Sequence, residues 1–212
     1  MSGINHFETF LLAGILLNLT PGNDTIFILT KSIAQGRRAG VLSAMGIATG
    51  SIIHTLFAAF GLSIIIAKSL LLFDLVKYAG AGYLIYIGIK TLLDKSKLDF
   101  TQGDPQATKN AAVKTYRDAV VTNVLNPKVA MFFIAFLPQF IDPSAKTHVL
   151  PFLTLGLTFT TTGTIWCVIL AIFSAQIFSK LRSHDKFSVY LNKTCGTVLV
   201  GLGIKLAFTN RE

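Results

Sequence analysis

Hydrophobic residues fall into long uninterrupted blocks along this chain, and charged residues are largely confined between them. Residues 39–67 and 149–179 contain no Asp, Glu, Lys or Arg. Runs of about 20 apolar residues are typical of helices that cross a membrane. We therefore predict an all-α integral membrane protein with six transmembrane helices. The expected spans are residues 7–30, 39–67, 70–93, 118–140, 149–176 and 187–208.

The sixth span is the weakest element of this prediction. Lys193 and Lys205 leave only residues 194–204 uncharged, so both ammonium groups would have to reach a membrane surface along their flexible stems. A chain with five spans is the alternative, and it would place the C-terminus on the other side of the membrane.

Composition agrees with a membrane protein. Only 14% of the 212 residues are charged, whereas about 25% is usual in a soluble domain. The net charge of +9 would suit a nucleic-acid partner. The basic residues, however, lie mainly in the connections between the expected spans, and no basic stripe is interleaved with aromatic residues. We therefore expect no nucleic-acid partner. Cys167 and Cys195 both fall in apolar runs, and we expect packing residues and no disulfide.

The distribution of basic residues predicts the orientation of the chain. Lysine and arginine are concentrated in the connections near residues 31–38, 90–117 and 180–193. The positive-inside rule places these connections in the cytoplasm and both termini outside it. Three spans in each half give the halves opposite orientations, which predicts a 3+3 inverted repeat. The expected units are a first three-helix repeat at 1–93, a cytoplasmic linker at 94–117 and a second three-helix repeat at 118–212.

The first expected span of each half is interrupted in a similar way. The first contains Asn18-Leu-Thr-Pro-Gly-Asn-Asp24, and the fourth contains Asn123-Val-Leu-Asn-Pro-Lys128. Proline removes a backbone donor and disrupts a helix. Freed backbone groups within a membrane are tolerated only where protein or a water-filled cavity satisfies them. At a rise of about 1.5 Å per residue, both prolines lie near the bilayer midplane. The two breaks therefore predict broken first and fourth helices with a transporter site between them.

Each break carries a charged residue. A charge at the bilayer centre costs about 2.5–3.5 kcal/mol on translocon scales, which favours a functional role for Asp24 and Lys128. Asp24 is expected to bind a substrate ammonium or to accept a coupling proton, and the alternative is a structural cap on the helix that restarts after Gly22. Lys128 is expected to face a substrate carboxylate or to pair with Asp24. Its alternative is an ammonium group that reaches the cytoplasmic face. Opposite charges suit a zwitterionic ligand.

The other candidate substrate-binding or coupling residues lie mostly around the two breaks. They are Asn18, Thr20, Pro21, Gly22, Asn123, Asn126, Pro127 and His54. Polar side chains at the breaks are expected to hydrogen-bond the freed backbone groups, with ligand contact as a second role. His54 lies inside the second span, where it is either a proton relay or a hydrogen-bonded packing residue.

Glycines are expected to allow close helix packing. Gly46 and Gly50 form a small-xxx-small pattern in the second span. The glycines expected to act alike in the third and sixth spans are Gly80, Gly82, Gly88, Gly196, Gly201 and Gly203. Trp166 is either a packing residue or membrane-interface anchor, or part of a cavity wall.

No pattern for catalysis or cofactor binding stands out. The sequence has no His/Cys/Asp cluster at metal-ligand spacing, no nucleophile elbow and no phosphate-binding loop. We therefore predict a secondary transporter and no enzyme, with no cofactor and no metal.

Several motifs resemble those of one transporter family. The first half contains Leu19-Thr-Pro-Gly-Asn-Asp-Thr25, Gln35-Gly-Arg-Arg-Ala-Gly40 and Gly46-Ile-Ala-Thr-Gly50, followed by His54. In the second half, the proline motif precedes Phe132-Phe-Ile-Ala-Phe-Leu-Pro-Gln-Phe140. Nearly the whole chain resembles the lysine exporter (LysE) superfamily, and more specifically its homoserine/threonine efflux (RhtB) branch. Members usually carry Pro-Gly-Pro-Asp at the first break, where Asn23 replaces the second proline here.

The resemblance implies a bacterial inner-membrane exporter of amino acids or close derivatives, coupled to the proton gradient. The implied partners are the lipid bilayer, a small amino acid and protons, with a homodimer as a candidate assembly. Two other functions stay open: a membrane assembly or sensory component that binds a partner through residues 94–117, and a passive small-solute channel. The substrates left open are homoserine, threonine, leucine-like and basic amino acids.

Overall fold

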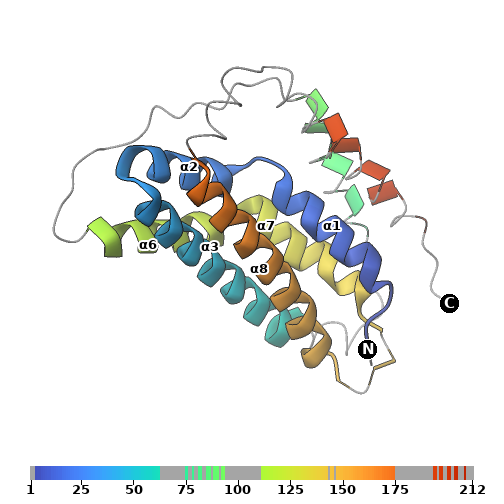
Figure 1. The fold of residues 1–212 in the computed structure, drawn as a ribbon. Coiled ribbons are helices and arrows are strands. Elements are labelled where there is room, and N and C mark those ends of the chain that lie inside the picture. The colour runs from blue at the N-terminus through green and yellow to red at the C-terminus, as the bar shows by residue number, and fades with distance from the viewer. Residues whose placement is uncertain are drawn as a thin grey trace.

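The computed structural model describes residues 3–62, 111–142, 144–145 and 147–174, together with scattered helical positions between 75 and 93 and between 193 and 208. These residues form an all-helical structure, and their one β-bridge joins Ile4 to Ile141. The long helices lie side by side (Figure 1). The α-helices are α1 (Phe7–Leu19), α2 (Asn23–Gln35), α3 (Arg37–Phe57), α6 (Ala111–Val124), α7 (Pro127–Met131) and α8 (Val149–Ile172). The π-helical turns are η1 (Ala58–Leu62) and η2 (Phe132–Phe136), and a 3-10 turn, η3 (Leu137–Phe140), follows η2.

The described residues contain two straight helical segments long and apolar enough to cross a membrane. They are Arg37–Leu62 and Val149–Ile172, which confirms the second and fifth expected spans as long apolar helices. Two further segments, α1 with α2 and α6 with α7 to η3, are each bent by 47° at a short break, so the described residues hold up to four spans. The third and sixth expected spans lie largely outside the described residues. The count of six and the inverted repeat stay predictions.

Small residues bring α3 into close contact with its neighbours. A Cβ atom at Gly46 would lie 2.5 Å from the carbonyl oxygen of Tyr116 on α6. One at Gly50 would lie 2.6 Å from Oδ1 of Asn123. On the other side of α3, the methyl group of Thr55 would lie 2.3 Å from a Cβ at Gly156 of α8. The small-xxx-small prediction for α3 is therefore confirmed.

The described positions of the third and sixth spans also meet through glycine. A Cβ atom at Gly196 would lie 2.7 Å from the carbonyl oxygen of Gly88, and one at Gly203 would lie 2.9 Å from that of Ala81. Among the described residues, nothing lies within 4 Å of a Cβ atom at Gly82 or Gly201, so this contact does not involve them there. Gly80 lies outside the described residues.

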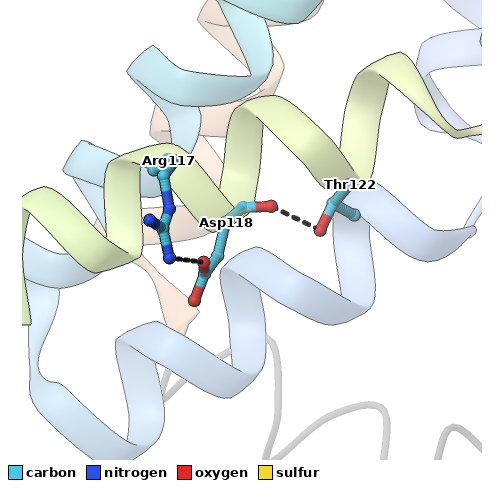
Figure 2. Close-up of polar contacts among 3 residues, drawn as sticks. All are labelled: Arg117, Asp118 and Thr122. Atoms are coloured by element: carbon cyan, nitrogen blue, oxygen red, sulfur yellow. Dashed lines mark hydrogen bonds and ion pairs between the residues drawn. The ribbon is translucent and has the colours of Figure 1, made fainter.

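Helix α6 begins at Ala111, before the expected span and inside the segment expected to be a linker. Two polar contacts hold this first part: Thr115 Oγ1 donates to Oε1 of Gln35 at 3.4 Å, and the Tyr116 hydroxyl lies 2.7 Å from Oγ1 of Thr49. Figure 2 shows the exposed side of α6, where a guanidinium nitrogen of Arg117 lies 3.8 Å from a carboxylate oxygen of Asp118.

Two apolar clusters fill the interior. The first, called here the phenylalanine cluster, packs the start of α1, the turns after α7 and the start of α8; its aromatic members are Phe10, Phe132, Phe133, Phe136, Phe140, Phe152 and Phe159. The second, called here the aliphatic cluster, packs α2, α3, α6 and the end of α8; its members are Ile28, Leu29, Ala44, Ile47, Ala119, Cys167, Leu170 and Ala171. Each cluster joins elements from both halves of the chain.

A short N-terminal segment is tied to the end of the second broken helix. The backbone N–H of Asn5 donates to the carbonyl of Phe140 at 2.8 Å, and that of Asp142 donates to the carbonyl of Gly3 at 3.1 Å. Hydrogen bonds from the hydroxyl and the backbone N–H of Ser144 hold the pKa of the Asp142 carboxyl below its ordinary value. This carboxylate therefore belongs to a surface turn outside the helices.

Candidate functional site

The first break separates α1 from α2 at Pro21. Thr20 has the extended conformation expected before proline (φ −64°, ψ 120°), and Gly22 is also extended. The Thr20 hydroxyl donates to the carbonyl of Leu16 at 2.8 Å, which satisfies one backbone acceptor at the end of α1. The carbonyl of Thr20 itself has no helical donor, because the proline interrupts the ladder.

The second break separates α6 from α7 and is better capped. Asn126 is the N-cap of α7, and its Oδ1 accepts a 3.0 Å hydrogen bond from the backbone N–H of Lys128. Pro127 occupies the first helical position, where a missing N–H costs nothing. Both predicted breaks are thus confirmed, and each lies beside its proline.

The Asp24 carboxylate is held by the opposite break. Nδ2 of Asn123 donates to Oδ2 of Asp24 at 2.8 Å, and Nδ2 of Asn126 donates to Oδ1 at 3.1 Å. The side chain of Asn126 therefore serves two groups at once, its oxygen capping α7 and its nitrogen binding Asp24. Both hydrogen bonds join Asp24 to the second half of the chain, which disfavours the alternative of a cap on its own helix.

Lys128 makes the reciprocal contact. Its Nζ donates to the carbonyl oxygen of Thr20 at 2.7 Å, so an ammonium group from the second break satisfies the acceptor freed at the first. Positive charge is favourable at this position because it lies at the C-terminal end of α1. Lys128 thus turns inward to the breaks, and the alternative of a side chain that reaches the membrane surface is wrong.

Asn123 is fixed from three directions. Besides its bond to Asp24, its Oδ1 accepts a 3.4 Å bond from the Ser51 hydroxyl. Its backbone carbonyl lies 3.3 Å from Nε2 of His54. The imidazole is buried and stacks on the ring of Phe133 at 5.6 Å between centroids. His54 therefore lies behind Asn123 in a packed, hydrogen-bonded position.

The side chain of Asn18 hydrogen-bonds to helix α8. Its Nδ2 lies 3.4 Å from the carbonyl of Phe159 and 3.3 Å from the hydroxyl of Thr162. A Cβ atom at Gly163 would lie 3.0 Å from its Oδ1. Asn18 and Asn123 are therefore placed alike, each against a glycine of a long helix from the other half.

These groups surround a small cavity between the two apolar clusters. Its volume is about 40 Å³, and a water molecule needs roughly 10–15 Å³ on this measure, so a few waters would fill it. Predicted site residues in its lining are Asn18, Thr20, Gly22, Asp24, Asn123, Asn126 and Lys128. Pro21, Pro127 and His54 lie outside the lining and shape or support it. Both signs of charge thus line one small cavity.

Helix α8 adds lining residues that the sequence argument did not select as site residues. They include Phe159, Thr160, Gly163, Thr164, Trp166 and Cys167. Their three- and four-residue spacing indicates one broad face of a helix. The spacing is visible in the sequence, but this face contains no proline or charged residue that would indicate a site. Trp166, which the sequence left open, is part of the cavity wall. Within the described residues, no group of three His, Cys, Asp or Glu side chains could hold a metal.

Comparison with known proteins agrees with this architecture. The family model described as LysE type translocator matches residues 15–210. The chain is 32% identical to the uncharacterized membrane protein YrhP of Bacillus subtilis, over 90% of this chain and 92% of that one. It is 29% identical to the leucine efflux protein of Klebsiella pneumoniae, over 97% and 96% of the two chains. No solved structure matches the chain. With these matches across a multi-pass helical protein, the chain belongs to the LysE type translocator family, a family of transporters and not of enzymes.

Proposed function

We propose that this protein exports amino acids or close derivatives across the bacterial inner membrane, coupled to the proton gradient. One observation carries the proposal: Asp24 and Lys128, which come from two different helix breaks, line the same cavity. Charges at membrane depth are costly and mark substrate or ion pathways. The leucine efflux relatives support amino-acid export as the activity.

The apolar clusters on either side of the cavity favour a carrier. The phenylalanine cluster lies toward the start of α1, and the aliphatic cluster lies toward the ends of α2 and α8. A passive channel needs a continuous polar route, whereas a carrier needs a site that opens to one side at a time. A small polar cavity with apolar packing on either side is the arrangement expected of such a carrier site.

The two charges suit the two ends of a zwitterion. We assign the substrate ammonium or a coupling proton to Asp24, and the substrate carboxylate to Lys128. An amino acid is larger than the few waters that fit the cavity, so binding must move side chains. The contact between Lys128 and the Thr20 carbonyl is the one that a carboxylate would replace most directly, because a carboxylate is the stronger acceptor.

The wider architecture that we propose is the 3+3 inverted repeat, with the basic connections in the cytoplasm and both termini outside. The matching contacts of Asn18 with Gly163 and of Asn123 with Gly50 support it, because each joins a broken helix of one half to a long helix of the other. Within the family we propose the homoserine/threonine efflux branch on its motifs. Homoserine, threonine, leucine-like and basic amino acids are the substrates to test, and a homodimer is the assembly to test.

Gradient-driven efflux in membrane vesicles tests the proposal. Asp24→Asn and Lys128→Ala should each lower amino-acid efflux at least tenfold. The matched controls are Asp142→Asn, in a surface turn, and Lys114→Ala, on the exposed side of α6, and both should keep wild-type efflux. Normal efflux in both site variants would refute these roles. Flux that persists unchanged without a proton gradient would support a passive channel instead.

A further inference from the structure

Two polar groups on α8 are buried in the cavity wall without a hydrogen-bond partner. They are the hydroxyl of Thr160, a residue only 7% exposed, and the indole N–H of Trp166. Both residues line the cavity that contains Asp24 and Lys128. Among the described residues, neither group meets a donor or acceptor.

Other threonines on α8 show that this condition is unusual for the helix. The hydroxyls of Thr154, Thr158 and Thr164 each donate to the carbonyl one turn earlier, at distances between 2.7 and 2.9 Å. A membrane helix commonly satisfies hydroxyl groups in this way. The hydroxyl of Thr160 therefore differs from those of its neighbours on the helix. Like the N–H of Trp166, it is a buried polar group without a partner, which needs a physical explanation. A molecule bound in the cavity that both residues line would supply one, once side chains move to admit it.

The chemistry of Trp166 limits what that occupant can be. An indole N–H donates and cannot accept, so the atom that it binds must be an acceptor. The Asp24 carboxylate on the same cavity attracts a cation. A zwitterion brings both a cation and an acceptor, and the α-amino acid of the proposed function is such a ligand once side chains move to admit it.

Thr160 is expected to contact a different atom of the ligand from the one that Trp166 contacts. Six residues separate Thr160 from Trp166, which places them roughly 9 Å apart along the helix axis. We therefore assign the two groups to different atoms of a ligand. Thr160 then lies next to another part of the ligand, or to a water that accompanies it. The affinity lost when its hydroxyl is removed should therefore not depend on whether the ligand has a carboxylate.

We propose that Trp166 is a carboxylate-binding residue of this transporter, which donates its indole N–H to a substrate carboxylate oxygen that Lys128 leaves unbound. The proposal rests on the proposed function, since it assumes an amino acid in the cavity. It adds a neutral donor on α8 to the two charged residues of the breaks, and it makes recognition of the carboxylate depend on a helix that carries no charge.

Calorimetric binding to purified protein in lipid nanodiscs tests the assignment. The probes are leucine and 3-methylbutylamine, which is leucine without its carboxylate. Trp166→Phe keeps an aromatic ring and removes the N–H, so leucine affinity should fall about tenfold or more while the affinity of the amine stays unchanged. Thr160→Val should change the two affinities by equal factors, and Thr154→Val, on the exposed side of α8, should change neither. Melting temperatures of the variants check that each one folds.

The outcomes separate this inference from the proposed function. An equal loss for leucine and its amine in Trp166→Phe, or no loss at all, would overturn the carboxylate assignment. Gradient-driven export of leucine together with such a result would leave the proposed function intact. If leucine does not bind the wild-type protein, the two probes are replaced by an amino acid that the protein exports in the vesicle assay and by the amine that results from its decarboxylation. Failure to bind or export any common amino acid would overturn both proposals.

Discussion

Asn123 holds the carboxylate of Asp24 across the two helix breaks, with Nδ2 2.8 Å from Oδ2. The side-chain amide of Asn123 also accepts a hydrogen bond from Ser51 on α3, and the backbone carbonyl of Asn123 lies beside His54. A side chain held in this way has one orientation, with nitrogen toward the acid and oxygen toward the hydroxyl. The relationship turns two separate breaks into one polar unit.

Removal of the Asn123 amide should weaken both the fold and transport. Asn123→Leu keeps a similar volume but leaves the Asp24 carboxylate and the Ser51 hydroxyl short of one partner each. Such a loss costs about 1–3 kcal/mol when the groups are buried. We expect a lower melting temperature in detergent and loss of efflux in vesicles. Thr122→Val on the neighbouring position of α6 is the control and should melt near the wild type, because the Thr122 hydroxyl donates to the Asp118 carbonyl of its own helix (Figure 2).

The missing side chain at Gly50 is expected to be essential because it leaves room for the Asn123 amide that binds Asp24. An alanine Cβ there would lie 2.6 Å from Oδ1 of Asn123, so Gly50→Ala must push the amide away from Asp24. Overpacking of this kind costs about 1–3 kcal/mol. Gly61→Ala is the matched control, since open space surrounds that glycine. Equal melting temperatures and equal efflux for the two variants would show that the contact between α3 and Asn123 is not needed.

The helix breaks could be predicted from the sequence because proline acts locally. Pro21 and Pro127 remove backbone donors whatever surrounds them, and both helices end where these residues require. Small residues on α3 were equally informative, since a glycine at helical spacing indicates close packing without naming the partner.

The partners of the charged groups could not be predicted, because they depend on how the two halves pack. Sequence reasoning left Lys128 facing a ligand, Asp24 or the membrane surface, and its ammonium binds the carbonyl of Thr20. Backbone acceptors have no sequence signature, so this contact was missed. Helix α8 was underestimated for a similar reason: threonine, tryptophan and cysteine on an apolar helix look like packing residues until the cavity beside them is known.

The departure from the family's usual first motif leads to a prediction about stability. Asn23 is the first residue of α2, where the backbone N–H has no helical acceptor, and Gly22 before it is extended. Proline fits both conditions. Asn23→Pro should therefore raise the free energy of unfolding by about 0.4–1 kcal/mol, mainly by restricting the unfolded chain. Thermal unfolding of the variant and the wild type in detergent measures this difference in stability. A lower melting temperature would show that α2 begins differently from the structure described here.

The one tryptophan of the chain provides a direct signal from the cavity. Trp166 is the single Trp in the sequence and lines the site, so an amino acid that enters should change its fluorescence. Asp24→Asn should shift the titration to higher ligand concentration, because the cation loses its charged partner. The Asp142→Asn variant should titrate like the wild type. A fluorescence change that saturates identically in Asp24→Asn would separate the binding site from this carboxylate.

Cys167 should report on the opening of the cavity. It is 8% exposed and belongs both to the cavity lining and to the aliphatic cluster, so its side chain is largely covered in this structure. In a Cys195→Ser background, Cys167 is the sole remaining thiol. We expect slow alkylation by a membrane-impermeant maleimide, faster labelling from the side to which the cavity opens, and protection by a saturating transported amino acid. Mass spectrometry of inside-out and right-side-out vesicles measures these rates. An equal rate from both sides that substrate leaves unchanged would argue against a cavity that opens to one side at a time, because a carrier site must be covered from one direction while it is reached from the other.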